Sequence, residues 1–367
     1  MGRRRAALAL AAIVLGSVSP AVAGRVVLDV VDRQVLEATD ADAVIGPGRV
    51  ADLLLVVALR DRLTAGDLKL TDRVTLLPVA GDRGPHLSAH DLEVGELLQL
   101  LLVTDSRTAA KTLAWAVGPS IGRALARMQQ VSTQLGLTHT VVAEDWPFGA
   151  GTTAGISGRR GATTARDLGR LALVIVSDAE LRRRLALDGV PISNGGLIVR
   201  ATSPLITLHD EAPVTTPATG TVIPSDVRIS LAEHDGLTLL AVTTGPRAHE
   251  DLTAAFERGF QRYRRVELVR EGQPVGPTVH VRGGIIPSFN AVAAEPWALT
   301  TNQGSPHGLA FHLQLPSQIE APVEVHQPVG ELVVERDGRV VAVVPLVAPQ
   351  AIAPSGWLDT ARQSSAR

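Results

Sequence analysis

The sequence predicts an α+β protein in two parts, a first domain with a helix-rich centre and a smaller all-β domain after residue 265. Three apolar blocks of helical length (50–63, 94–104 and 107–117) are too apolar throughout to be surface helices. From about Val214 the apolar period changes to two, which is typical of strands. With 367 residues, 45% of them hydrophobic, the chain can form two cores.

The first domain is expected to open with a hairpin, because residues 25–38 are rich in β-branched side chains around a turn at Asp32. Residues 121–136 have the apolar spacing of an amphipathic helix. The TTARDL segment (163–168) starts another helix with capping hydroxyls. The glycine-rich segment 149–161 has no apolar period, so we expect a loop there.

The last part of the first domain and the second domain contain two hairpins with Asp-Gly turns. Residues 226–245 turn at Asp235-Gly236, and residues 331–347 turn at Asp337 and the glycine after it. Between them, residues 251–265 have the pattern of a helix, after which the sequence is β-rich and punctuated by proline and glycine.

These features divide the chain into four predicted parts: a signal peptide (1–23), the first domain (24–265), an all-β, sandwich-like domain (266–352) and a polar tail (353–367). The signal peptide is predicted from three arginines, an apolar run and a small-x-small cleavage signal, Ala-Val-Ala. The apolar run is shorter than the roughly 20 residues of a membrane span, which favours cleavage over a retained anchor. We therefore expect an exported protein of the periplasm or the extracellular cell envelope.

Composition excludes several classes of function. The chain has no cysteine, which removes disulfides, cysteine-ligated metal sites and thiol nucleophiles. The formal charge of −2, which becomes −5 when the three arginines of the signal peptide are removed, argues against nucleic acid as a partner. His86 and His90 are a weak metal pair in a polar loop without a third ligand nearby, so no metal and no cofactor is expected. The tail has no large apolar face, so we expect no stable membrane anchor after cleavage.

Several connected stretches, in order, resemble the exported D-alanyl-D-alanine carboxypeptidases, the low-molecular-mass penicillin-binding proteins of the penicillin-binding protein 5 type. They are LDVVDRQVLEATDADAVIGPG, LKLTDRVTL, LEVGELLQLLLV, LGLTHT, TTARDLGRLA, HDGLTLLAVTTG and EAPVEVHQPVGELVVERDGRVVAVVPLV. The resemblance implies a β-lactamase/DD-peptidase-like domain, an antiparallel sheet plus a helical subdomain, followed by a small all-β domain. It also implies a serine peptidase that trims terminal D-alanine from peptidoglycan stem peptides.

That chemistry needs three motifs. In Ser-x-x-Lys at a helix start, a neutral lysine amine accepts the proton of the serine one turn away. A Ser-x-Asn relays protons and holds the substrate amide, and a Lys-Thr-Gly on an edge strand binds the substrate carboxylate and backbone. The resemblance places the three motifs on Arg49 and Asp52, on Asp105 and Arg107, and on Ala218, Thr219 and Gly220.

None of the three motifs is intact. Arginine does not deprotonate to act as a base, and aspartate is a poor substitute for a serine nucleophile. A shift of register does not restore the first motif, because residues 40–58 contain neither serine nor lysine. No Ser-x-x-Lys exists in the chain, since the residues three before Lys69 and Lys111 are Gly66 and Thr108. What remains of the substrate groove is predicted at Ser106, Thr219, Gly220 and Thr221.

The substituted positions carry opposite charges. We expect Arg49 to pair with Asp105 and Asp52 to pair with Arg107, filling the former cleft. The alternative is four independently solvated charges, since isolated surface pairs contribute little.

Two other hydroxyl residues lie in sequences that resemble the surroundings of a catalytic nucleophile. Thr108 precedes Lys111 by three residues but lies in an apolar helix, so we interpret the pair as core with a snorkelling lysine. Ser120 lies in a G-x-S-x-G sequence, but the residues before it are helical, which favours a turn between helices over a nucleophile elbow.

Three hypotheses of function follow. The first is a catalytically inactive homologue that acts in cell-wall biology by binding a peptidoglycan stem peptide or a cell-wall protein. The second is an active serine-type carboxypeptidase that uses unorthodox residues or one of Ser106, Thr108 and Ser120. The third is a structural or assembly protein of the envelope.

Overall fold

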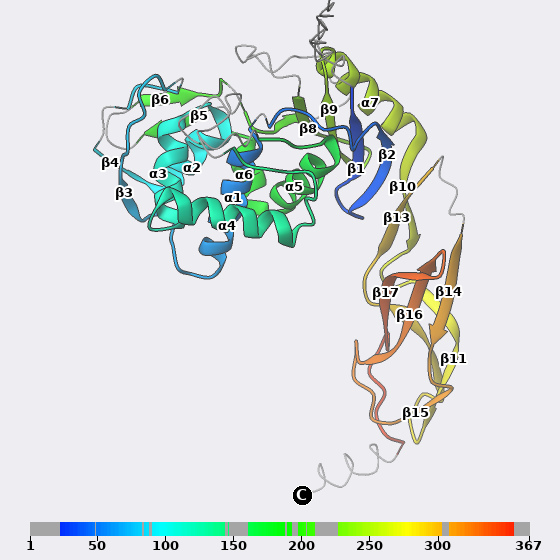
Figure 1. Ribbon diagram of the computed structural model, residues 1–367. Helices are drawn as coiled ribbons and strands as arrows, with labels where there is room; N and C mark the ends of the chain where they lie inside the picture. The colour runs from blue at the N-terminus through cyan, green and yellow to red at the C-terminus, as the bar shows by residue number, and fades with distance from the viewer. Residues whose placement is uncertain are drawn as a thin grey trace, which may run out of the picture.

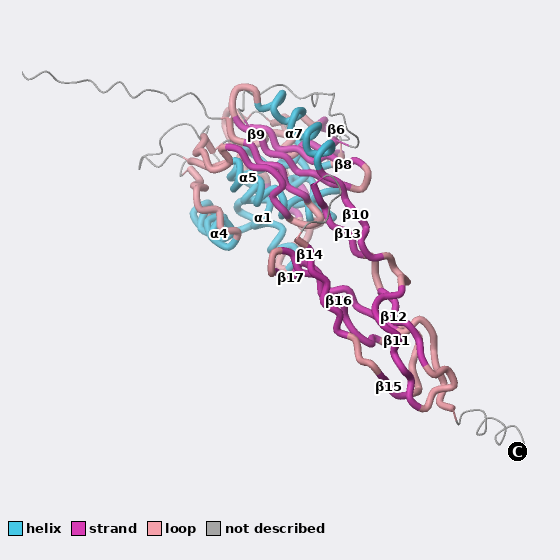
Figure 2. Tube along the Cα trace, turned by 90° about the vertical axis from the view of Figure 1, so that its right-hand side faces the viewer, coloured by secondary structure: helices cyan, strands magenta, loops and turns pink. Residues whose placement is uncertain are grey.

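The computed structural model describes residues 23–47, 49–82, 84–87, 90–143, 146, 161–187, 189–192, 197–202, 204–209, 227–302 and 308–355. They form a broad α+β domain and an elongated β domain that extends from one side of it (Figures 1 and 2). Residues 1–22, most of the 149–161 segment, the predicted groove residues Thr219, Gly220 and Thr221, and the tail from 356 lie outside the described residues.

The first domain is built on a five-stranded sheet in the order β2-β1-β9-β8-β7. Its strands are β1 (Arg25–Asp29), β2 (Gln34–Thr39), β7 (Thr207–His209), β8 (Val227–His234) and β9 (Leu237–Thr244). All pairs are antiparallel except β7 with β8. Every residue of the central strand β9 is buried, because helices cover both faces of the sheet.

The two covering helices are α5 (Ala165–Ser177) and α7 (Ala248–Arg262). Both approach the sheet closely at a glycine. A Cβ on Gly169 of α5 would lie 2.9 Å from Val26, and a Cβ on Gly259 of α7 would lie 2.6 Å from Leu239. Alternate β1 residues therefore belong to different cores, with Val26 on the α5 side and Val27 on the α7 side.

A helical subdomain packs beside α5. Its helices are α1 (Val50–Thr64), α2 (Val94–Val103), α3 (Arg107–Val117), α4 (Ile121–Gln134) and α6 (Ala179–Leu185). The first ten residues of α1 are buried, and α1 packs against α3, α4 and α5. Two short ribbons flank these helices: β3 (Arg73–Thr75) with β4 (Asp91–Glu93), and β5 (Gly189–Ile192) with β6 (Leu197–Arg200).

The β domain has its own core and consists of a ribbon and a six-stranded sheet. The ribbon pairs β10 (Tyr263–Val269) with β13 (Trp297–Asn302). The sheet has the order β14-β16-β17-β12-β11-β15. Its strands are β11 (Pro274–Arg282), β12 (Ser288–Ala293), β14 (Leu309–Gln314), β15 (Gln318–Glu320), β16 (Pro328–Arg336) and β17 (Arg339–Val347).

The predicted hairpins and the central apolar helices are confirmed. The helix predicted over 251–265 needs a correction, since α7 covers Ala248–Arg262 and Tyr263 already belongs to β10. The reason is tertiary, because Tyr263 and the residues after it pair with β13, and helix propensity alone does not reveal that partner. No helix among the described residues has both the length and the apolar character needed to cross a membrane.

Candidate functional site

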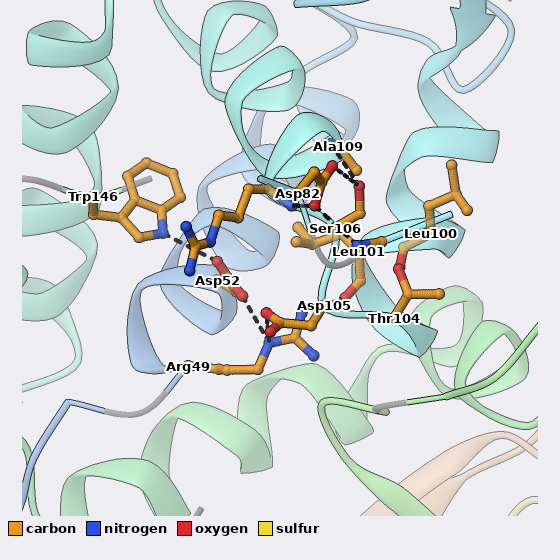
Figure 3. A network of polar contacts seen from close by, with 12 residues as sticks. Arg49, Asp52, Asp82, Leu100, Leu101, Thr104, Asp105, Ser106, Ala109 and Trp146 are labelled. Carbon is orange, nitrogen blue, oxygen red and sulfur yellow. Dashed lines mark hydrogen bonds and ion pairs between the residues drawn. The ribbon is translucent and has the colours of Figure 1, made fainter. Parts of the chain in front are cut away.

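The N-terminus of α1 holds the two positions that the resemblance assigns to the nucleophile and its lysine. Arg49 precedes the helix and Asp52 lies in its first turn, where a carboxylate is favoured by the helix dipole. Arg49 Nε lies 2.8 Å from Asp52 Oδ2 and 3.7 Å from Asp105 Oδ1. Arg49 Nη2 also donates to the Leu101 carbonyl at 3.0 Å (Figure 3). The guanidinium thus joins α1 to the end of α2 and the turn that follows it.

The first predicted charge pair, Arg49 with Asp105, is present. Asp52 has other partners than the one we expected: one oxygen accepts from Arg49, and Oδ1 accepts from the indole Nε1 of Trp146 at 3.1 Å. The main-chain N–H of Arg107 donates to Asp82 Oδ1 at 2.8 Å. Sequence reasoning missed Trp146 because nothing in its neighbourhood marks it as a partner of α1.

Ser106 lies between Asp105 and Arg107 in the sequence and caps α3. Its side chain is 2% exposed, and Oγ accepts from the Ala109 N–H at 3.1 Å. The same Oγ donates to Asp82 Oδ2 at 3.1 Å. The Ser106 hydroxyl therefore both donates and accepts a hydrogen bond within the protein.

Asp82 is the main polar residue of the site that the sequence did not reveal. Besides Ser106 Oγ, its carboxylate accepts from the main-chain N–H groups of Arg107, Thr108 and Gly84 at 2.8, 2.9 and 3.0 Å. Burial raises the pKa of Asp82, but hydrogen bonds from the Thr108 side chain and from these three N–H groups outweigh it and lower the pKa below its usual value. The Asp-x-Gly sequence at 82–84 was the available signal, since such sequences form local turns.

The segment that carries Asp82, which we call the strap (residues 77–82 and 84), lies along α3. The Leu77 and Val79 N–H groups donate to Thr112 Oγ1 and Thr108 Oγ1 at 3.0 and 3.2 Å. Lys111 Nζ donates to the Pro78 carbonyl at 3.4 Å. The predicted pair of Thr108 with Lys111 is thus part of the packing between α3 and the strap.

The strap covers Ser106 closely. A Cβ on Gly84 would lie 2.5 Å from Ser106 Cβ and 2.7 Å from its Oγ, a distance that side chains do not adopt. Only glycine allows this approach without displacement of the strap.

The remaining candidates lie elsewhere. Ser120 caps α4 by accepting from the Arg123 N–H at 3.2 Å, in a turn between α3 and α4 as predicted. His86 and His90 are exposed, and His90 Nδ1 lies 3.0 Å from Asp91 Oδ1. Among the described residues, no three His, Asp or Glu side chains are placed to hold a metal ion. Ala218, the lysine position of the third motif, lies in the part of the chain that is not described.

The chemistry that this arrangement offers is electrostatic. One guanidinium is placed between two carboxylates, and a third carboxylate is satisfied by helix N–H groups. Serine-type acyl transfer requires a hydroxyl nucleophile next to a base, and neither Arg49 nor Asp52 has a hydroxyl.

The first domain has the fold of the β-lactamase-like class and is followed by a β domain. Two family models match the chain: "Beta-lactamase enzyme family" over residues 9–186 and "Penicillin-binding protein 5, C-terminal domain" over residues 263–354. The two matches, one over each domain, indicate a protein of the penicillin-binding protein 5 type, the D-alanyl-D-alanine carboxypeptidase family of cell-wall metabolism.

Solved structures share the fold over both domains. The peptidoglycan synthesis regulatory factor (PBP3) of Streptococcus pneumoniae is 16% identical, with a TM-score of 0.70 over 90% of this chain and 98% of that chain. Penicillin-binding protein 6B of Escherichia coli is 15% identical, with a TM-score of 0.60 over 90% and 95%. The D-alanyl-D-alanine carboxypeptidase DacD of Francisella tularensis is 16% identical, with a TM-score of 0.56 over 96% and 97%. No curated protein matches the sequence.

Proposed function

We propose that this protein is an exported, non-acylating member of the family that acts in cell-wall biology by binding. The observation that carries the proposal is the ion pair between Arg49 and Asp52, which occupies the positions of the family's serine and lysine. An activated serine needs a neighbouring group that accepts its proton. Here the two positions neutralise each other, and Arg49 is held further by Asp105 and the Leu101 carbonyl.

The missing groups are also those with the largest effect on rate. Removal of a single member of a catalytic triad lowers kcat by several orders of magnitude. In this chain the first motif has lost both of its reacting side chains and the third has lost its lysine. The second has an aspartate and an arginine in place of serine and asparagine.

The proposed ligand is a peptidoglycan stem peptide or a cell-wall protein. In sequence, Thr219 and Gly220, followed by Thr221, keep two residues of the family's Lys-Thr-Gly motif, and we propose strand addition by an extended peptide as the mode of binding. A solved structure with the same fold is described as that of a peptidoglycan synthesis regulatory factor. The proposed export rests on the arginines, apolar run and cleavage signal of residues 1–23.

The first test is covalent labelling by a penicillin. The full chain without residues 1–23 is incubated with excess benzylpenicillin, and its intact mass is measured beside an active D-alanyl-D-alanine carboxypeptidase as the positive control. We expect the control to gain the mass of one acyl group and this protein to keep its own mass. An adduct that maps to one serine or threonine would establish the alternative, an active serine-type carboxypeptidase.

The second test separates binding from a structural role. A stem-peptide fragment that ends in D-Ala-D-Ala is added at millimolar concentration, and the melting temperature is measured with an L-Ala-L-Ala fragment as the control. A ligand that binds only the folded state raises the melting temperature. Equal melting temperatures with both fragments, together with no protein captured from envelope extracts, would favour the structural or assembly role.

A further inference from the structure

The turn of the first hairpin contacts the ribbon of the β domain. Asp32 Oδ1 accepts from Arg265 Nη1 of β10 at 2.9 Å, and Asp32 Oδ2 accepts from the Thr300 N–H of β13 at 2.8 Å. Arg265 Nη2 also donates to the Ala298 carbonyl of β13 at 3.0 Å. One carboxylate of the first domain therefore holds both strands of the ribbon.

A second set of contacts continues along β2, the edge strand of the first sheet. Tyr263 Oη donates to the Leu36 carbonyl at 2.8 Å. Beside it, Arg262 at the end of α7 pairs within the first domain, with Nη1 3.1 Å from Glu37 Oε1. Arg336, at the end of β16, donates from Nη1 to Gln34 Oε1 at 3.1 Å. The β domain thus contacts the first domain through the β10–β13 ribbon and through the end of β16, and not only through the covalent connection.

The connection between the domains has no linker. Helix α7 ends at Arg262 and β10 begins at Tyr263, whose N–H donates to the Gly259 carbonyl in the last turn of the helix. Polar interfaces between domains of one chain ordinarily permit relative motion, and a flexible linker increases it. Here the hinge is a single peptide unit, and the contacts of Asp32 lie beside it.

We propose that Asp32 is a latch that fixes the orientation of the β domain relative to the first domain. Its side chain is 16% exposed and that of Arg265 is 21% exposed, so salt screens this pair less than a pair at the open surface. The neighbouring pair of Arg262 with Glu37 has a 52% exposed arginine and lies within the first domain, so it does not hold the β domain. While Asp32 keeps its contacts with Arg265 and Thr300, the β domain holds one orientation relative to the first domain. This inference does not depend on the proposed function.

The absence of native cysteine allows a direct measurement. Gln134→Cys in α4 and Glu320→Cys in β15 place one spin label on an exposed position of each domain of the full chain. We expect one narrow distance distribution for this doubly labelled parent, at both 0.1 M and 1 M NaCl. Asp32→Ala is expected to broaden the distribution several-fold, and Asp32→Asn, which keeps one acceptor oxygen, to broaden it less.

The matched control is Asp67→Ala, which removes an aspartate whose pair with Arg62 is long, at 4.0 Å, and exposed. Its distribution is expected to equal that of the parent. Arg265→Met removes the ion pair of the latch from the β-domain side and leaves the bond from the Thr300 N–H, and it replaces Asp32→Ala if the far-UV circular dichroism of that variant shows misfolding. A broad distribution in the parent, or a narrow one in both latch variants, would overturn the proposal.

Discussion

Arg49 and Asp52 form an ion pair across the first turn of α1, with Nε 2.8 Å from Oδ2. The resemblance assigns the family's serine and lysine to these two positions, at the same spacing of three residues. That spacing places two side chains on one face of a helix, which suits a proton transfer in the family and a salt bridge here.

Loss of the cation from this pair is expected to destabilise the fold. Arg49→Ala leaves the carboxylates of Asp52 and Asp105 close together without their shared partner. Because the arginine is only partly exposed, we expect a loss of about 1–3 kcal/mol in the free energy of unfolding. Urea denaturation measures it. The control in the same helix is Arg60→Ala, whose pair with Asp61 is more exposed, at 31% and 25%, and predicts a loss below about 1 kcal/mol. Equal losses in both variants would show that the contacts of Arg49 with Asp52 and Asp105 contribute no more to stability than the pair of Arg60 with Asp61.

The carboxylate of Asp82 is expected to make stability depend on pH. Asp82→Ala removes acceptors for four hydrogen bonds and is expected to cost about 1–3 kcal/mol at pH 7. The folded pKa of Asp82 lies below its usual value of 3.8, so this contribution is complete above the unfolded pKa and is lost as pH falls through the folded pKa. The difference between parent and variant should therefore shrink below about pH 4. Denaturation curves between pH 2.5 and 7 measure this difference. A constant difference over that range would argue against the ionised carboxylate as its source.

The close approach of the strap to Ser106 predicts a penalty at Gly84. Gly84→Ala places a Cβ 2.5 Å from Ser106 Cβ, so the strap must move away from α3. Overpacking of this kind costs typically 1–3 kcal/mol. Gly46→Ala is the control, because nothing lies within 4 Å of its new Cβ and its effect should be small. The melting temperatures of the two variants measure this penalty. A Gly84→Ala variant as stable as the parent would mean that the strap does not contact Ser106 closely.

The indole of Trp146 is expected to hold its segment against α1 through Asp52. Trp146→Phe keeps most of the apolar ring and removes the Nε1–H that donates to Asp52 Oδ1 at 3.1 Å. A loss of about 1.5–3 kcal/mol is expected from one hydrogen bond to a charged acceptor. Trp115→Phe, at a position that is 48% exposed, should change stability by less. Urea denaturation, followed by circular dichroism, gives both values.

Much of the fold was predictable because it follows from local pattern. The hairpins turn at Asp32, Asp235 and Asp337, and the apolar blocks became α1, α2 and α3 within one residue at each end. Periodicity and turn chemistry act over a few residues and are visible in the sequence. The end of α7 was placed three residues too late, since Tyr263 leaves the helix to pair with Asn302, a partner 39 positions further along the chain.

At the candidate site, the sequence by itself determined which groups are absent. A chain with two lysines, neither preceded by serine at the required spacing, cannot form the family's catalytic pair, whatever its fold. It also identified Arg49 and Asp105 as partners, because the motifs of the resembling family place them together. Only the tertiary structure decided which contacts the side chains at the candidate site make. Asp82 reaches Ser106 across 24 residues and Trp146 reaches Asp52 across 94. Partners so far apart in sequence are selected by the packing of whole elements, and no periodicity or spacing along the chain encodes them.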